Sequence, residues 1–239
     1  MVALTPIVPA EGQSRLIDRV CALVDRADYR LADTPELREA VFQLRYQAYL
    51  REGAIEANET QSFSDPLDNQ ANALIFGIYI DGALASSIRL HIASPAHHQL
   101  PAMNVFADLL EPELAVGKVI VDPTRFVADR GASRRYPELC YVTTRLAWLA
   151  SEYYAANYLL ATVRAEHQAF YRRTFGHKVI CEPRHYPSLT KPISMMALDF
   201  PLNRERVLRR YPFFRSSVFE RRMLFGAQAA RQVDLAKAA

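Results

Sequence analysis

A carboxylate and a guanidinium stand three residues apart in the sequence Asp122-Pro-Thr-Arg125, directly after the apolar run Val119-Ile-Val121. The apolar run predicts a β-strand, and Pro123 interrupts it because proline cannot donate a hydrogen bond to a neighbouring strand. The spacing alone allows two interpretations. The two charges form an ion pair at the end of a strand, or they form an acid-base site at the point where the sheet is broken.

Other charged residues occur where a structural role alone would be costly. Arg89 falls in the middle of an apolar stretch, where a cation must face a partner or a polar cleft. Arg45 and Tyr49 lie beside the apolar stripe of a predicted helix, from which they could reach the same cleft. Asp65 and Asp68 lie in a long polar loop, and loops of that kind in compact domains are usually functional or disordered.

The elements that must position these residues follow from hydrophobic periodicity and turn signals. The sequence Asp33-Thr-Pro-Glu36 predicts a helix start, and apolar residues then recur at helical spacing until Gly53. The pair Asp81-Gly82 between two apolar runs predicts a β-hairpin, with strands at 74–80 and 83–92. The other predicted elements are helices at 12–27, 137–153 and 166–175, strands at 29–32, 118–122, 158–163, 179–181 and 194–200, and a loop at 54–73.

The order of these elements predicts an α/β (α+β) protein with one mixed sheet and helices on both of its faces. We expect residues 93–113 to form a crossing segment that contains Pro and His, with Phe106 and Leu109-Leu110 as apolar anchors. A turn that contains Arg130, Arg134 and Arg135 should follow the strand that ends near Asp122.

The composition is that of a soluble globular enzyme, since 50% of the 239 residues are hydrophobic and 23% are charged. No apolar run approaches the roughly 20 residues that span a bilayer, and the first residues lack a signal-peptide pattern, so we expect a cytoplasmic protein. The 3 cysteines show no metal-binding spacing and should be reduced and buried. His97 and His98 are adjacent, which fits a surface loop better than a metal site.

Positive charge is concentrated at the C-terminal end. Residues 201–239 hold nine Lys and Arg against three Asp and Glu, so the rest of the chain is net negative although the whole carries +3. An acidic partner would therefore bind this end of the chain. Only Tyr211-Pro-Phe-Phe-Arg215 mixes aromatic residues with charge, and we expect no nucleic-acid binding.

Several separated motifs, taken in order, resemble a known enzyme family. The set resembles the acyl-homoserine-lactone (autoinducer) synthases and, more closely, the related N-acyl-amino-acid synthases of the N-acyl-tyrosine synthase type. The resemblance covers about residues 29–200. The motifs are Leu44-Arg45-Tyr46-Gln-Ala-Tyr49, Asp65-Pro-Leu-Asp68, Ile88-Arg89-Leu90, Asn104-Val-Phe106, Asp122-Pro-Thr-Arg125-Phe126, Phe170-Tyr171-Arg-Arg-Thr-Phe-Gly176 and Glu182-Pro-Arg-His-Tyr186-Pro187.

The resemblance implies the GNAT-like acyl-CoA N-acyltransferase fold over 29–200, with an accessory helix in 1–28 before it and a basic extension at 201–239 after it. It implies an acyltransferase that moves a long-chain fatty acyl group from an acyl carrier protein to the amino group of an amino acid, with no tightly bound cofactor or metal. Two alternatives stay open. They are an autoinducer synthase, and a non-catalytic GNAT-like module that binds acyl chains or carrier proteins.

Two departures from the related families guide the choice of substrates. Autoinducer synthases carry Glu-x-Ser-Arg where this chain has Asp122-Pro-Thr-Arg125, which argues against homoserine-lactone formation. Ordinary GNAT enzymes hold the coenzyme A diphosphate on a loop of the form Arg/Gln-x-x-Gly-x-Gly/Ala, and residues 129–135 do not fit that spacing. We therefore expect an acyl carrier protein rather than acyl-CoA as donor. An acidic carrier would dock on Arg130, Arg134, Arg135, Arg172 and Arg173.

The implied reaction is aminolysis of a thioester, which needs a base for the ammonium group, donors for the oxyanion and a proton for the leaving thiolate. Asp122 is the candidate base, with its pKa raised by partial burial, and Arg125 holds either Asp122 or the acceptor's carboxylate. Backbone N–H groups around Val121 and Phe126 are candidate oxyanion donors. Tyr171 is either the acid for the thiolate or a packed core tyrosine.

The remaining candidates are assigned to substrate binding. Arg45, Tyr49, Asp65, Asp68 and Arg89 resemble the charged set that flanks the cleft in the autoinducer family, where they bind substrate or fix the architecture. Phe106, Phe126 and Trp148 line an acyl tunnel or belong to the core.

Overall fold

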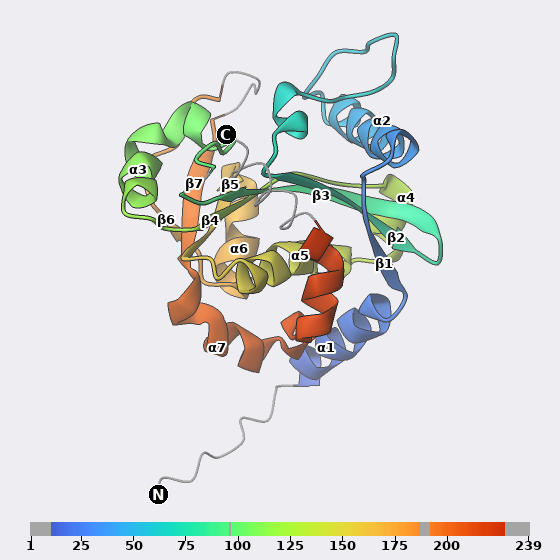
Figure 1. Ribbon diagram of the computed structural model, residues 1–239. Helices are drawn as coiled ribbons and strands as arrows, with labels where there is room; N and C mark the ends of the chain where they lie inside the picture. The colour runs from blue at the N-terminus through green and yellow to red at the C-terminus, as the bar shows by residue number, and fades with distance from the viewer. Residues whose placement is uncertain (1–10, 96, 187–191, 228–239) are drawn as a thin grey trace, which may run out of the picture.

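The computed structural model describes residues 11–95, 97–186 and 192–227, and one seven-stranded sheet forms the centre of this part (Figure 1). The strand order is β1-β2-β3-β4-β5-β7-β6. Neighbouring strands are antiparallel except β4 and β5, which are parallel. The strands are β1 (Ala27–Leu31), β2 (Ala73–Ile80), β3 (Ala83–Ala93), β4 (Ile120–Ala128), β5 (Tyr158–Val163), β6 (Lys178–Val179) and β7 (Ser194–Asp199).

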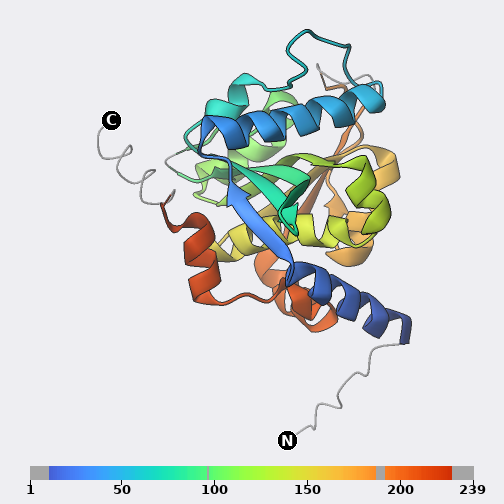
Figure 2. The same ribbon diagram turned by 90° about the vertical axis from the view of Figure 1, so that its right-hand side faces the viewer.

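Helices cover both faces of the sheet, as predicted (Figures 1 and 2). The upper face in Figure 1 carries α2 (Pro35–Arg51), the 3₁₀ helix η1 (Pro66–Asn69) and α3 (Met103–Ala115). The lower face carries α1 (Glu11–Val24), α5 (Leu139–Tyr153), α6 (Gln168–Thr174) and α7 (Phe200–Arg210). The other described helices are α4 (Arg130–Arg135), η2 (Ala165–His167), η3 (Pro212–Phe214) and the helical residues 218–227.

Helix α2 begins where its sequence predicts. The Thr34 side chain accepts a hydrogen bond from the Leu37 N–H, and Pro35 occupies the first turn, where its missing N–H costs nothing. Val41, Leu44 and Ala48 are buried, while Leu37 is only half-buried. The helix ends at Arg51, and Gly53 adopts a φ of +63°, a left-handed conformation that glycine reaches at little cost.

The predicted hairpin is also confirmed. Ile80 lies opposite Ala83, and the two turn residues between them have φ values of +51° at Asp81 and +83° at Gly82. Positive φ at both positions is the geometry of the tight hairpin turn that favours an Asp-Gly pair. The hairpin places Arg89 in the middle of β3, at the centre of the sheet.

Strand β4 differs from the prediction, because it does not end at Asp122. It continues through Pro123 to Ala128, and Pro123 lies opposite Leu90 of β3. The interruption that the sequence indicates is a β-bulge instead. The pairing passes from Arg89–Thr124 to Ser87–Val127, so that Arg125 and Phe126 together lie opposite Ile88, and Arg125 has a φ of +54°.

The parallel strands β4 and β5 separate almost as soon as they meet. Their pairing includes Ile120 with Tyr158 and Val121 with Leu159 and then stops, although β4 continues to Ala128 and β5 to Val163. Residues Asp122 to Phe126 of β4 therefore face a gap in the sheet on the side of β5.

The core is divided between the two faces. A large cluster below the sheet packs β2, β3 and β4 against α5, α7 and η3, with Trp148 at its centre. A separate cluster above the sheet lies under α3 and includes Phe106, Ile120, Leu160 and Met195. Leu160 of β5 thus lies at the gap, under the upper cluster.

Other predictions are confirmed or corrected locally. Helix α5, strand β5 and the helix closed by Gly176 occur as predicted, and Gly176 has a φ of +89°. Residues 93–113, for which we predicted a crossing segment without naming a helix, contain most of α3, which tolerates Pro112 inside it and has non-helical angles at Phe106. The basic segment after β4 is the short helix α4 rather than a turn.

Helix α1 and the helical residues 218–227 pack on the lower side of the sheet. The three cysteines are half-buried rather than buried, and none of them forms a disulfide. No helix among the described residues has the length and apolar character needed to cross a membrane. The division into an accessory helix, a core and a basic extension stays a prediction.

Candidate active site

Five charged side chains that the sequence places far apart meet on the upper face of the sheet. Asp68 Oδ1 accepts hydrogen bonds from Arg45 Nη1 at 2.8 Å and from Arg89 Nη1 at 2.9 Å. Arg89 Nη1 also donates to Asp65 Oδ1 at 2.7 Å. Asp65 Oδ2 in turn accepts from Arg125 Nη2 at 2.6 Å and from Arg125 Nε at 3.1 Å. The set forms one continuous network, which we call the arginine–aspartate network.

The local sequence Asp65-Pro-Leu-Asp68 fixes both carboxylates of this network. Asp65 caps η1 by accepting from the Leu67 N–H at 2.9 Å, and Asp68 Oδ2 accepts from the Asp65 N–H at 2.8 Å, a reciprocal capping box. Each carboxylate therefore accepts hydrogen bonds both from the backbone of η1 and from arginines. The motif Asp65-Pro-Leu-Asp68, which is not specific in sequence, holds two carboxylates in fixed positions.

The network is nearly closed to solvent, and its charges do not balance. Arg45 is 0% and Arg89 is 1% exposed. Burial by itself raises the pKa of Asp65, but Arg89 and Arg125 outweigh it and bring that pKa to about 2. The hydrogen-bonded set thus holds three guanidinium groups against two carboxylates. Two nitrogens of Arg45, Nε and Nη2, are buried without a hydrogen-bond partner in the described part of the chain.

Arg125 lies at the open end of the network. Its side chain is 15% exposed, and its guanidinium carbon lies 5.6 Å from the Tyr49 ring centroid and 5.0 Å from that of Phe63. The two rings meet edge to face at 5.2 Å. Aromatic faces stabilise a cation without consuming its N–H groups, so Arg125 is held in place while part of its fork can bind a ligand. Phe63 is a site residue that the sequence analysis did not identify.

His91 also belongs to this site, and no motif pointed to it. It is fully buried on β3 opposite Asp122, and its Nε2 donates to the Leu67 carbonyl at 3.1 Å. Burial and the nearby Arg89 lower the pKa of His91 to about 3, which keeps the imidazole neutral. It therefore contributes no further charge to the network.

Asp122 does not bond to Arg125, which corrects the expected ion pair. Its Oδ2 accepts from the Ala102 N–H at 3.0 Å, and its Oδ1 accepts from Thr162 Oγ1 on β5 at 3.3 Å. The carboxyl group therefore bridges the gap between β4 and β5. Asp122 is fully rather than partly buried, and burial raises its pKa to about 6. Thr162 was not identified from the sequence.

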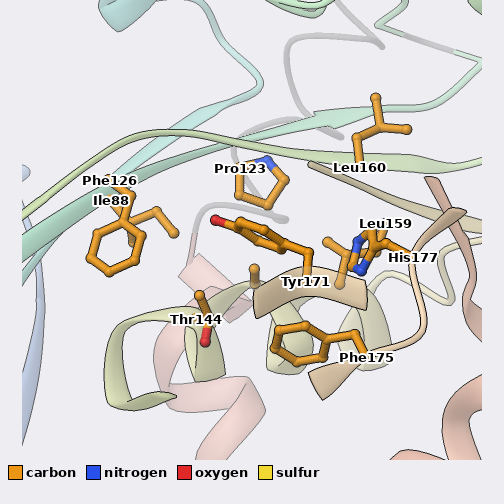
Figure 3. A pocket seen from close by; sticks show the side chains of 10 residues that line it. Ile88, Pro123, Phe126, Thr144, Leu159, Leu160, Tyr171, Phe175 and His177 are labelled. Carbon is orange, nitrogen blue, oxygen red and sulfur yellow. The ribbon is translucent and has the colours of Figure 1, made fainter. Parts of the chain in front are cut away.

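A small cavity lies on the lower side of the same gap (Figure 3). Pro123 and Phe126 of β4 line it from one side, and Leu159 and Leu160 of β5 line it from the other. Tyr171 of α6 projects into it with its hydroxyl directed toward Pro123 (Figure 3). Burial raises the pKa of Tyr171 to about 12, so the phenol stays protonated at neutral pH.

The other predicted aromatic residues lie apart from this cavity. Trp148 is fully buried against Phe175, Phe200 and Phe214, with ring centroids at 5.9, 4.6 and 5.5 Å, so it lies in the core. Phe106 is fully buried in the cluster under α3. Leu160 contributes to that cluster and also to the cavity wall, and it therefore lies between the two.

The two candidate oxyanion donors on the backbone of β4 differ in how far they are already paired within the sheet. Val121 lies in the fully paired part of the strand, opposite Ile92 of β3 and Leu159 of β5. Phe126 lies in the bulge and at the cavity, where the pairing of β4 is irregular. Phe126 is therefore the better placed of the two candidates.

The five arginines predicted to dock a carrier are all exposed, and they divide between two helices. Arg130, Arg134 and Arg135 belong to α4, which begins directly after β4, and Arg172 and Arg173 occupy the last turn of α6. In addition, Asp129 caps α4 by accepting from the Ala132 N–H at 2.8 Å. A carboxylate thus occupies the helix end where an anion would otherwise bind.

The described residues contain no group of three His, Cys, Asp or Glu side chains that could hold a metal ion. Buried acids, arginines and backbone donors line the gap. Its upper side is charged at Arg125, and its lower side beside Tyr171 is mainly apolar.

Comparison with known proteins adds to this geometry. The model of the family described as "N-acyl amino acid synthase FeeM" matches residues 40–199. The structure of FeeM, an N-acyl amino acid synthase from uncultured soil microbes, is 21% identical, covers 77% of this chain and 96% of its own, and has a TM-score of 0.64. No curated protein matches.

Autoinducer synthases share the same fold. The CoA-dependent acyl-homoserine lactone synthase MesI is 18% identical over 81% of this chain and 97% of its own, with a TM-score of 0.52. The synthase LasI is 15% identical over 72% of this chain and 89% of its own, with a TM-score of 0.55. The mixed sheet with helices on both faces is a GNAT-like fold.

Proposed function

The chain belongs to the N-acyl amino acid synthase FeeM family and is an N-acyltransferase, and we propose that it moves a long-chain fatty acyl group from an acyl carrier protein thioester to the amino group of an amino acid. The proposal of an amino-acid acceptor rests on the unequal numbers of positive and negative groups in the arginine–aspartate network. Three arginines face two carboxylates there, and Arg45 keeps two buried nitrogens unbonded. A carboxylate from the acceptor would balance the surplus.

Arg125 is the residue we assign to that carboxylate. It is the most exposed cation of the network, and it combines a left-handed φ of +54° with two aromatic supports. A non-glycine residue in that conformation carries strain that the surrounding contacts must offset, as is common at functional sites. The bulge turns Arg125 to the same face as Asp65, beside the gap where a thioester would lie.

The reaction forms a C–N bond and breaks a C–S bond. The acceptor's ammonium first gives one proton to a base, and its nitrogen then attacks the thioester carbon. The tetrahedral intermediate collapses, the thiolate leaves, and the second nitrogen proton ends on sulfur. Products are an amide and a free thiol, with one proton released.

Each of these steps has a candidate residue. Asp122 is the proposed base, acting through water across the gap, and its pKa of about 6 suits a base near neutral pH. The Phe126 N–H is the proposed oxyanion donor, and Tyr171 the proposed acid for sulfur. Thr162 and the Ala102 N–H would hold the Asp122 carboxyl in place.

The choice of donor rests on α4. Coenzyme A needs a diphosphate site at a helix end, and Asp129 already occupies that end of α4 with its own carboxylate. The exposed arginines of α4 and α6 complement an acidic carrier instead. The second candidate function is autoinducer synthesis, which the fold similarity to MesI and LasI favours.

Mass spectrometry of lipids from cells that overproduce the chain tests the proposal. We expect long-chain N-acyl amino acids, reduced about 10²-fold or more by Asp122→Asn and by Arg125→Lys. Asp28→Asn, which changes an exposed carboxylate on β1, is the matched control and should leave the yield unchanged. Acyl-homoserine lactones with consumption of S-adenosylmethionine would instead support the second candidate. Good expression with neither product would contradict both candidate functions.

A further inference from the structure

One side of the helical segment 218–227 exposes apolar side chains, and none of them belongs to the candidate active site. Val218, Phe219 and Met223 keep 58%, 73% and 70% of their surface in solvent. At 100° per residue these three positions, with exposed Arg222 among them, fall on one continuous side of the helix. We name this side the outer face.

The opposite side of the helix is held firmly against the protein. Phe225 is fully buried, with its ring 5.8 Å from that of Phe76. Arg221 donates to Glu152 at 3.0 Å, and Arg145 of α5 donates to Glu220 Oε2 at 3.1 Å. The outer face is therefore presented by a rigid element rather than by a loose end, and no rearrangement is needed to expose it.

The charge around the outer face is strongly positive. Residues 200–227 contain seven arginines and two glutamates, a net +5, and no aspartate or lysine. Glu220 is one of the two glutamates and is already paired with Arg145. Arg209, Arg210, Arg215 and Arg222 are exposed. An approaching partner would thus meet apolar side chains surrounded by cations.

We propose that the outer face docks on an anionic lipid bilayer. Phenylalanine, valine and methionine that project from a helix between arginines match the interface between headgroups and acyl chains. The cavity beside Tyr171 includes no residue of this helix, so the outer face is separate from the candidate active site. Each arginine near an anionic surface and each buried apolar side chain adds to the attraction.

The proposal is tested with the full chain and lipid vesicles, without any substrate, so its outcome does not depend on the proposed reaction. Co-sedimentation is measured with phosphatidylcholine vesicles and with vesicles that also contain phosphatidylglycerol. We expect binding only to the second kind, weakened by salt. The double change Phe219→Ser with Met223→Ser should lower the partition coefficient about 10-fold or more, and Arg222→Ser about 5-fold.

Val116→Ser is the matched control, because Val116 is 71% exposed at the far end of α3 and should not affect binding. Circular dichroism should show equal melting of all variants, since Phe219 and Met223 are largely exposed in the described part of the chain. If the double variant melts lower, Phe219→Ser alone replaces it. The proposal would be overturned if the protein did not bind anionic vesicles, or if it bound neutral vesicles equally well. It would also be overturned if the changes at Phe219 and Met223 left the partition coefficient unchanged. Self-association that these changes abolish would likewise overturn it and would assign the outer face to a second copy of the chain.

Discussion

The two faces of strand β4 carry opposite kinds of chemistry within a few residues. On the upper face, Asp122, Thr124 and Arg125 contact charged or polar partners, and Arg89 Nε donates to Thr124 Oγ1 at 3.1 Å. On the lower face, Pro123 and Phe126 line an apolar cavity with Tyr171. The strand therefore separates a charged side from an apolar side, which the proposed function assigns to the acceptor and to the acyl thioester.

The bulge is what makes this separation possible. Side chains of a regular strand alternate between faces, which would send Arg125 to the apolar side with Pro123. The extra residue opposite Ile88 lets Thr124 and Arg125 share the upper face and returns Phe126 to the lower one. The left-handed φ of Arg125 is the local cost of that arrangement.

Substitutions on the upper face should lower the stability of the protein more than substitutions on the lower face, and Arg89→Leu should have the largest effect. The change leaves Asp65 and Asp68 buried with a lost partner, so we expect the free energy of unfolding to fall by about 3–5 kcal/mol. Urea denaturation followed by circular dichroism measures it. Arg30→Leu, which breaks an exposed pair with Asp28, should cost less than about 1 kcal/mol. Equal losses in both variants would show that the buried network contributes no more to stability than an exposed ion pair.

Arg125→Lys should separate binding of the acceptor from stability. Lysine keeps the charge but loses the planar fork that bonds Asp65 through two nitrogens. We expect kcat/KM for the acceptor to fall about 10²-fold, with KM for the acyl donor changed less than about 3-fold. Release of free thiol, measured while each substrate is varied in turn, distinguishes the two. A larger effect on the donor than on the acceptor would reverse the assignment of the two faces.

The parts of this arrangement that could be predicted from sequence are those set by local signals. The Asp33-Thr-Pro-Glu36 helix start and the Asp81-Gly82 turn each depend on nearby residues only, and both occur as predicted. Four of the five network residues were identified as a group only through their resemblance to a family, and the structure brings Arg45, Asp65, Asp68 and Arg89 together with Arg125.

What could not be predicted depends on distant parts of the chain. Pro123 indicated the end of a strand, but β4 has lost its β5 neighbour there, and proline is tolerated at such an edge. The pairing of Asp122 with Arg125 fails because the bulge turns Arg125 toward Asp65, and no spacing reveals a bulge. Helix α3 was missed because Pro112 lies inside it. His91 and Thr162 carry no motif and join the site only through the sheet.

Asp122 gives the upper face a distinctive pH dependence. Its pKa is about 6 in the folded protein and about 3.9 in an unfolded chain, so the folded state binds the proton more tightly. Stability should therefore fall as pH rises from about 4 to 6 and change no further above that, by about 3 kcal/mol from this group. Asp122→Asn should flatten the curve of unfolding free energy against pH over that range. An unchanged curve in this variant would mean that folding does not raise the pKa of Asp122.

The lower face should respond least, because Tyr171 acts on a leaving group that needs little help. A thiolate leaves as a weak base, so removing a proton donor costs less than removing the base or the acceptor site. Tyr171→Phe keeps the ring contacts with Phe170 and Phe175, at 5.2 and 6.4 Å, and should leave the melting temperature within about 2 °C. We expect kcat to fall about 10-fold or less at constant KM for the acceptor, with the loss growing for donors whose thiols have a higher pKa. Tyr141→Phe, a matched change on α5 outside the cavity lining, should leave kcat unchanged. If Tyr171→Phe lowers kcat equally for all thiol donors, the phenol does not protonate sulfur, and the apolar face contributes only the shape of the cavity.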